Sequence, residues 1–277
     1  MPASVLPLTV LRPSQKWPSL GLNALWEYRE LLYFLVWRDV KVRYKQTALG
    51  VAWAVLQPFL TMVVFAIFLG HLVRVPSDGL PYPLFAYAAL LPWQLYAHTI
   101  TECGTSIVAN QQLITKVYFP RLVIPIASVL AGCVDFVFAS AVLVAMLLYY
   151  GVAPTVLILT FPLFALLAVA AALAVGLWLS VLNVEYRDVR YTLPFLGQIW
   201  LLATPVAYST QIIPERWRAL YSLNPMVGAV EGFRWAVLGT VEAPGGVLLP
   251  SVAATIVLLL GGLVFFRRME HEFADVV

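Results

Sequence analysis

The chain has 277 residues, of which 62% are hydrophobic and only 11% are charged, and its mean hydropathy is +0.88. With 17 Lys and Arg against 14 Asp and Glu, it has too few charges to cover a soluble particle and no broad basic face for nucleic acid. Only two cysteines are present, which excludes a disulfide-stapled secreted domain, so the composition predicts a polytopic membrane protein.

The N-terminal 45 residues divide into a tail and a predicted surface helix. Residues 1–24 contain four prolines and no basic segment followed by an apolar core, which is typical of a cytoplasmic tail rather than a signal peptide. From residue 26 to 45, aromatic and aliphatic residues alternate with charges, which predicts an amphipathic helix at the cytoplasmic membrane surface. We expect its basic residues to meet anionic lipid or an acidic partner surface; they are Arg38, Lys41, Arg43 and Lys45. The helix is either a passive anchor or a platform for a cytoplasmic partner.

Six apolar stretches are candidates for membrane-spanning helices, which need about 20 apolar residues each. They are residues 51–73, 84–108, 122–150, 156–182, 193–209 and 247–266. The runs are continuous rather than alternating, which favours transmembrane helices over strands. Pro194 and Pro205 bracket the short fifth stretch and predict a kinked helix there. We therefore expect an all-α integral membrane fold with six transmembrane helices.

The distribution of basic residues predicts the orientation. With the N-terminus in the cytoplasm, the Lys and Arg residues lie in the inner segments except for Arg74, Arg216, Arg218 and Arg234. The positive-inside rule therefore places both termini, including a C-terminal tail of residues 269–277, in the cytoplasm.

Residues 212–239, between the fifth and sixth stretches, are too apolar for water, yet Pro214 and Asn224-Pro225 divide them into pieces too short to cross. Prolines at these positions favour helix starts and Gly239 favours a stop, which predicts short helices over 215–222 and 226–238. We expect a re-entrant pair in the outer leaflet, with a plain interfacial hairpin as the alternative.

Polar groups lie inside two of the predicted spans. Gln94, His98 and Glu102 follow one another at four-residue steps, so they share a helix face, and Asp135 lies in the third stretch. These ionisable groups form either a proton relay or hydrogen bonds between helices.

Enzyme motifs are missing from the sequence. None of the four lysines lies in a Gly-rich phosphate loop, the three histidines are far apart, and no nucleophile elbow frames a serine. We therefore expect no catalytic residue, metal site or ATP site on this chain.

Two short cytoplasmic loops, residues 110–121 and 183–191, are charged and contain tyrosines, as in a docking surface, although simple membrane-edge loops share this composition. At these loops the chain resembles the membrane subunits of type-2 ABC exporters for bacterial surface polysaccharides, the O-antigen and teichoic-acid permeases. Further matching stretches are residues 41–50, 91–96, 116–121, 224–226 and 231–235. The resemblance covers residues 25–268.

This resemblance implies a homodimer in the bacterial inner membrane, paired with two separate ATPase subunits that hold ATP and magnesium, which exports a lipid-linked polysaccharide. It implies that loop 110–121 couples hydrolysis to the pore and that the outer short helices shape the exit. The expected coupling residues are Gln111, Lys116, Tyr118, Phe119, Arg121, Arg187 and Arg190. His98 and Glu102 lie outside the family pattern. Alternatives are a permease for teichoic acid, capsule or a small-molecule drug, a membrane scaffold, or an integral-membrane enzyme.

A path for a sugar polymer needs hydrogen-bonding groups for its hydroxyls and aromatic rings for its apolar C–H faces. The first and fifth stretches offer both at helical spacing. The predicted lining residues are Trp53, Gln57, Thr61, Phe68, Phe195, Gln198 and Tyr208. We expect these spans of two subunits to line a channel on the dimer axis, with bonding of the glutamines across a helix interface as the alternative.

Overall fold

The computed structural model describes residues 22–45, 50, 52–239, 243–271 and 273. The expected N-terminal tail up to residue 21 and most of the C-terminal tail beyond residue 271 lie outside the described residues. The described part of the chain forms eleven α-helices, one π-helical and two short 3₁₀ segments, and no strand. The all-helical class predicted from the continuous apolar runs is confirmed for this part of the chain.

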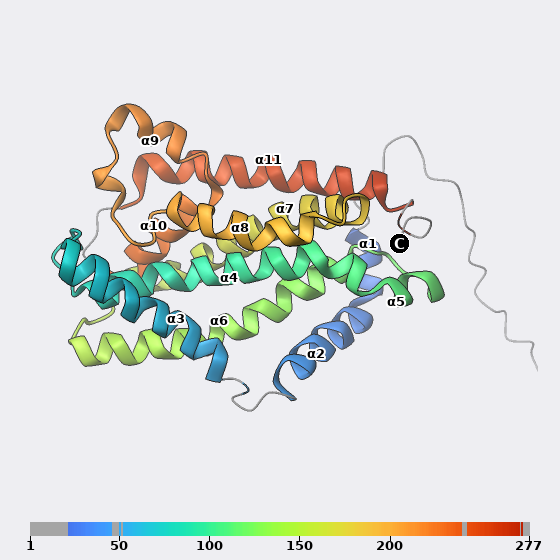
Figure 1. The fold of residues 1–277 in the computed structure, drawn as a ribbon, viewed down its shortest axis with the longest axis horizontal. Helices are drawn as coiled ribbons and strands as arrows, with labels where there is room; N and C mark the ends of the chain where they lie inside the picture. Colours follow the sequence, from blue (N-terminus) through green and yellow to red (C-terminus); the bar gives the residue numbers. More distant parts are fainter. Residues whose placement is uncertain (1–21, 46–49, 51, 240–242, 272, 274–277) are drawn as a thin grey trace, which may run out of the picture.

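Four long helices form the body of the molecule and run side by side along its long axis (Figure 1). They are α4 (Tyr82–Ala109), α6 (Val123–Tyr150), α7 (Phe161–Glu185) and α11 (Gly245–Met269). Helix α4 packs against both α6 and α7, and α7 packs against α11. Small residues such as Ala89 of α4 and Ala168 and Ala172 of α7 are fully buried, which allows close approach of the two backbones.

Two further helices pack on α4 and keep an open face. They are α3 (Ala52–Phe65), which continues as a π-helical segment (Ala66–Val73), and α8 (Val189–Leu202). Large apolar side chains on both remain exposed, for example Phe68 at 57% and Leu202 at 73%. Both helices therefore present apolar surface that the described part of this chain does not cover.

Among the residues that the structure describes, four helical segments have the length and hydropathy needed to cross a bilayer. They are Ala52–Val73, Val123–Tyr150, Val156–Glu185 and Gly245–Met269. Helix α4 has 28 residues, enough to cross, but is more polar. The fifth predicted stretch is not one kinked helix: α8 has 14 residues and ends at Leu202, before Pro205. Six spans therefore remain a prediction.

The helix predicted over residues 26–45 is divided in two. Helix α1 (Leu22–Glu27) and helix α2 (Arg29–Lys45) are separated by a turn at Tyr28, and α2 packs on α6. Leu35 is the one buried residue of α2, whereas Tyr33 and Trp37 are 70% and 54% exposed. An aromatic face directed away from the bundle is what a membrane-surface helix needs, and its position at a membrane remains a prediction.

The two short helices expected between the fifth and sixth stretches are present. They are α9 (Glu215–Tyr221) and α10 (Pro225–Leu238). The Asn224 side chain accepts a hydrogen bond from the backbone N–H of Met226 at 3.0 Å and caps α10, and Gly239 ends it with φ 66°. All residues of α10 except Trp235 are buried, and the helix packs against α4, α7 and α11. Helix α10 is therefore covered by protein, which a re-entrant segment requires.

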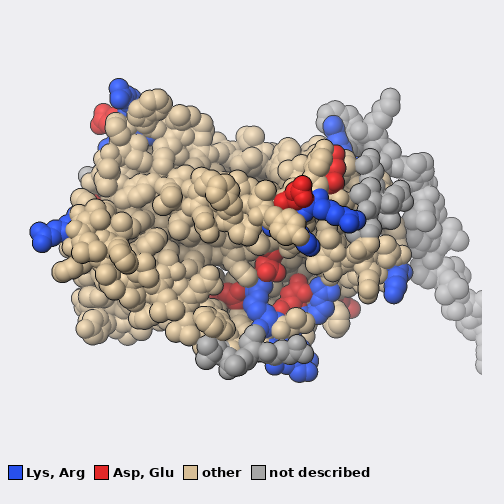
Figure 2. All heavy atoms as spheres, in the orientation of Figure 1, with Lys and Arg blue, Asp and Glu red and all other residues tan. Residues whose placement is uncertain are grey.

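Charged residues gather at one end of the molecule. Figure 2 shows most Lys, Arg, Asp and Glu near α2 and α5 (Gln111–Lys116), with a broad uncharged surface along the middle and a few charges at the opposite end. We name the end with α5 the inner end and the end with α9 the outer end.

Candidate functional site

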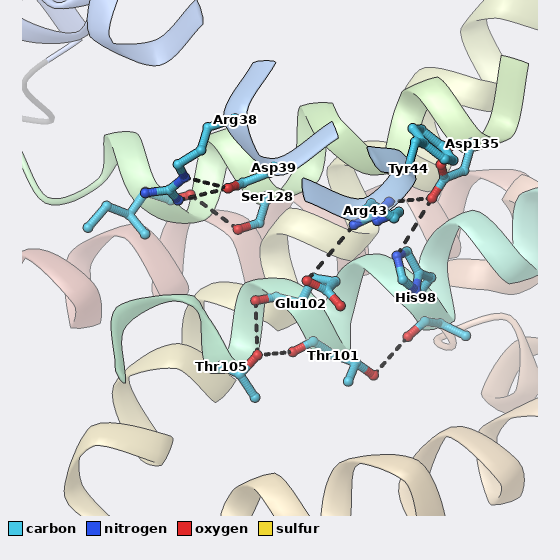
Figure 3. A network of polar contacts seen from close by, with 12 residues as sticks. Arg38, Asp39, Arg43, Tyr44, His98, Thr101, Glu102, Thr105, Ser128 and Asp135 are labelled. Atoms are coloured by element: carbon cyan, nitrogen blue, oxygen red, sulfur yellow. Dashed lines mark hydrogen bonds and ion pairs between the residues drawn. The ribbon is translucent and has the colours of Figure 1, made fainter. Parts of the chain in front are cut away.

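Charged side chains from three helices meet between α2, α4 and α6 (Figure 3). The Asp135 carboxylate on α6 accepts hydrogen bonds from the Arg43 guanidinium and the Tyr44 hydroxyl of α2. The Arg43 Nη2 lies 3.9 Å from the Glu102 Oε2, and the His98 Nε2 lies 3.7 Å from the Asp135 Oδ2. We name Arg43, His98, Glu102 and Asp135 the inner charge cluster.

The inner charge cluster corrects the role predicted for Arg43. We expected Arg43 to meet lipid or an acidic partner, but its guanidinium points into the bundle toward Asp135. An arginine, which does not release its proton, lies between Glu102 and Asp135. The arrangement therefore favours interhelical pairing over a proton relay. Burial and the hydrogen bond to Asp135 raise the pKa of Tyr44, so the Tyr44 hydroxyl keeps its proton and donates.

A polar cleft of about 490 Å³ lies beside the inner charge cluster. Its lining includes Arg38, Asp39 and Val42 of α2, Glu102 and Thr105 of α4, and Ser128 of α6. Arg38 and Asp39 form an ion pair of 2.7 Å on one wall. The cleft therefore separates part of α2 from α4 and contains charges of both signs.

The first predicted coupling loop is divided between an exposed and a buried part. Helix α5 projects past the bundle at the inner end (Figure 1), and its Gln111 and Lys116 side chains are exposed. Tyr118 is 78% exposed, but Phe119, which we expected beside it in a partner's groove, is 4% exposed inside an apolar cluster. Arg121 is not free either, because its guanidinium and backbone N–H donate to Glu270 after α11.

In the second predicted docking loop, residues 183–191, both arginines expected to take part in coupling are exposed. Arg187 and Arg190 are exposed, and the Arg190 guanidinium lies 4.6 Å from the centre of the Tyr191 ring. A hydrogen bond to Glu185 raises the pKa of the exposed Tyr186. Aromatic and basic groups are therefore accessible together here, which the composition of a protein interface favours.

Most side chains predicted for the polymer path lie on the open faces of α3 and α8. Trp53, Gln57 and Phe68 of α3 and its extension, and Phe195 and Gln198 of α8, are exposed.

Two other predicted path residues are engaged in local hydrogen bonds. The Thr61 hydroxyl donates to the Gln57 backbone carbonyl at 2.9 Å. Tyr208 lies beyond the end of α8, where its hydroxyl donates to the Leu202 carbonyl at 2.8 Å and lies 3.0 Å from the Tyr221 hydroxyl. Tyr208 therefore braces the outer turn instead of extending the α8 face.

A buried ion pair fixes α10 at the outer end. Arg234 is fully buried and donates to Glu231 at 3.0 Å and to the backbone carbonyls of Pro205 and Val206 at 2.8 and 3.3 Å. Its guanidinium carbon lies 3.8 Å from the centre of the Phe85 ring on α4. The sequence marks residues 231–235 only as a stretch similar to the exporter permeases, and the buried pairing gives this stretch a structural role.

Comparison with known proteins supports the membrane assignment. The family model described as ABC-2 type transporter matches residues 30–238. The chain is 31% identical to an O-antigen export system permease protein RfbA of Myxococcus xanthus over 259 residues, 92% of this chain and 98% of that protein. A protein of the same name from Klebsiella pneumoniae is 31% identical over 90% of this chain and 95% of its own length. The Escherichia coli polysialic acid transport protein KpsM is 24% identical over 84% of this chain and 91% of its own length.

Proposed function

The chain belongs to the ABC-2 type transporter family, and from this premise we propose that it is the permease subunit of an ATP-driven exporter of lipid-linked, O-antigen-type polysaccharide. The observation that carries the proposal is the near full-length similarity to two proteins named as O-antigen export permeases. The chain would not be an enzyme itself, since the nucleotide site would lie on a separate ATPase.

We propose a six-span topology in the inner membrane with both termini in the cytoplasm. The concentration of charges at the inner end supports this orientation (Figure 2). Helix α8 would cross with the help of the turns that follow it, in which Thr204, Pro205 and Val206 are buried. Irregular backbone at membrane depth is tolerated when protein covers it, as here.

The proposed partners are two ATPase subunits at the inner end and a second copy of this chain along α3 and α8. Exposed α5, Tyr118 and Arg190 offer the first surface. The uncovered apolar faces of α3 and α8 offer the second, and two six-span subunits together can enclose a polymer. ATP and magnesium would bind to the ATPase subunits.

Deletion of the gene tests the proposed function. We expect loss of a polysaccharide from the cell surface and accumulation of its lipid-linked form on the cytoplasmic side, both reversed by the plasmid-borne gene. The similarity to KpsM makes a capsular polymer the second candidate, and analysis of the lost glycan distinguishes the two. Normal surface glycans in the deletion strain would contradict both.

The proposed polymer path makes Gln57 and Gln198 accessible to water during transport. Cysteines placed at these exposed positions, with Cys103 and Cys133 replaced by Ala, should react with a membrane-impermeant thiol reagent in vesicles supplied with ATP. The control is a cysteine at Leu163 of α7, which is 63% exposed but is not one of the residues of the proposed path. Because lipid would cover this position, the control cysteine should not react. Protection of both path cysteines in every nucleotide state would place the path elsewhere.

A further inference from the structure

Helix α2 is attached to the bundle mainly by partly buried contacts. Leu35 is its one buried residue, and Leu31, Leu32 and Val36 are partly buried against the same apolar cluster. Near its C-terminal end the attachment is polar, through Arg43 and Tyr44 to Asp135 of α6. A helix held in this way can shift without exposing a large apolar surface to water.

The inner charge cluster offers a second set of pairings. Arg43 pairs with Asp135 but already lies 3.9 Å from Glu102, and His98 already lies 3.7 Å from Asp135. A move of Arg43 onto Glu102 would leave Asp135 with His98 in place of Arg43 and Tyr44. Because a neutral imidazole N–H can donate to a carboxylate, no carboxylate would lose its partner and no proton uptake is required. In both arrangements, each carboxylate of the cluster therefore keeps a hydrogen-bond donor.

There is room for such a move. The cleft of about 490 Å³ is bounded by Arg43 and Val42 on the α2 side and by Glu102 and Thr105 on the α4 side. Glu102 lies four residues, about one helical turn, closer to the inner end than His98 does. Closing the cleft would therefore bring α2 toward α4 and toward the inner end together.

We propose that Arg43 exchanges between Asp135 on α6 and Glu102 on α4 during the transport cycle, so that α2 has two defined positions on the bundle. His98 is a positioning residue that donates a hydrogen bond to the Asp135 carboxylate when Arg43 leaves it. The inference rests on the proposed function, because the ATPase subunits would supply the force that moves α2. Because each position of α2 has its own set of hydrogen-bond partners, the shift is a discrete step between two states. A helix with two such states can transmit a conformational change.

A spin-label distance measurement tests the exchange in the assembled complex. Labels at cysteines replacing Trp37 of α2 and Val137 of α6, both exposed, report the separation of the two helices in a chain with Cys103 and Cys133 changed to Ala. Excess unlabelled chain keeps each complex to one labelled copy. We expect ATP to change the distance by about 2 Å, because Arg43 lies only 3.9 Å from Glu102 and has to approach it to about 2.8 Å while it leaves Asp135. The Glu102→Gln variant should lose this change, whereas Glu30→Gln, which alters an exposed carboxylate of α2, should retain it.

Export measurements give a second readout. The Glu102→Gln variant should still co-purify with the ATPase but export at least about fivefold less glycan, the lower end of typical coupling between sites. His98→Gln, which keeps an N–H donor for Asp135, should export more than His98→Ala. An unchanged distance with and without ATP in an active complex, or a change that persists in Glu102→Gln, would overturn the exchange. A wild-type chain that co-purifies with no ATPase would instead contradict the proposed function.

Discussion

Replacing Arg234 by Met should destabilise the chain by about 3–5 kcal/mol, because the buried Glu231 carboxylate then loses its cation. Arg234 also donates to the carbonyls of Pro205 and Val206, which lie in the turns after α8. The substitution therefore removes the polar link between α10 and this turn as well. We expect a clear loss of folded protein in detergent, measured as a lower unfolding temperature and as a lower yield of monodisperse chain.

Two further variants separate the loss of pairing from a loss of packing. The double variant Glu231→Gln/Arg234→Met removes both charges, so it should be more stable than Arg234→Met alone. Arg216→Met, on the exposed surface of α9, changes the same residue type outside the core and should leave stability within about 0.5 kcal/mol. If the double variant is as unstable as the single one, the Glu231 charge is not the source of the cost.

Local patterns in the sequence predicted the helices well where one signal was sufficient. Asn224-Pro225 and Gly239 gave both ends of α10, because capping and a positive φ depend on adjacent residues alone. The fifth span was wrong as a continuous helix: hydropathy continues to Ser209, but α8 ends at Leu202 and the chain turns before Pro205. Hydropathy alone does not indicate the residue at which the backbone hydrogen bonds of a helix end.

The inner charge cluster could not be predicted from local patterns. Arg43 and Asp135 are 92 positions apart, and the basic residues around Arg43 fit a membrane-surface helix equally well. The four-residue spacing of His98 and Glu102 did indicate a shared face, but not what that face would meet. A lone carboxylate in an apolar run was the available signal, because such a group needs a partner from another helix.

Phe119 shows the same limit within a predicted docking loop. An aromatic residue beside Tyr118 in a short charged loop is as suited to a partner's groove as to the chain's own core, and which of the two it enters depends on helices distant in sequence. In the structure, Phe119 belongs to one buried apolar cluster that also contains Leu35 of α2, Ile107 of α4 and Phe266 of α11. It therefore joins these helices at the inner end, with Tyr118 turned outward.

Replacing each of the two neighbouring aromatic residues by Ala should consequently impair different properties of the permease. Tyr118→Ala should leave the permease folded but weaken ATPase binding by on the order of 2 kcal/mol, about 30-fold in Kd, as for an interface aromatic anchor. Phe119→Ala should cost about 3–5 kcal/mol of permease stability through the cavity it leaves. Unfolding temperature of the permease alone, and the amount of ATPase retained on the tagged permease, measure the two effects.

Val117→Ala is a suitable control, because Val117 is 52% exposed in the same loop and offers no aromatic anchor. We expect it to keep both permease stability and ATPase binding near those of the wild type. Equal retention of the ATPase by Tyr118→Ala and Val117→Ala would show that the docking surface excludes this loop tip, and α5 or the second loop around Arg190 would then carry the contact. Loss of ATPase binding in Phe119→Ala with unchanged stability of the permease alone would instead mean that the ring belongs to the docking surface and not to the core of the unassembled chain, because a side chain packed in that core cannot be removed without cost.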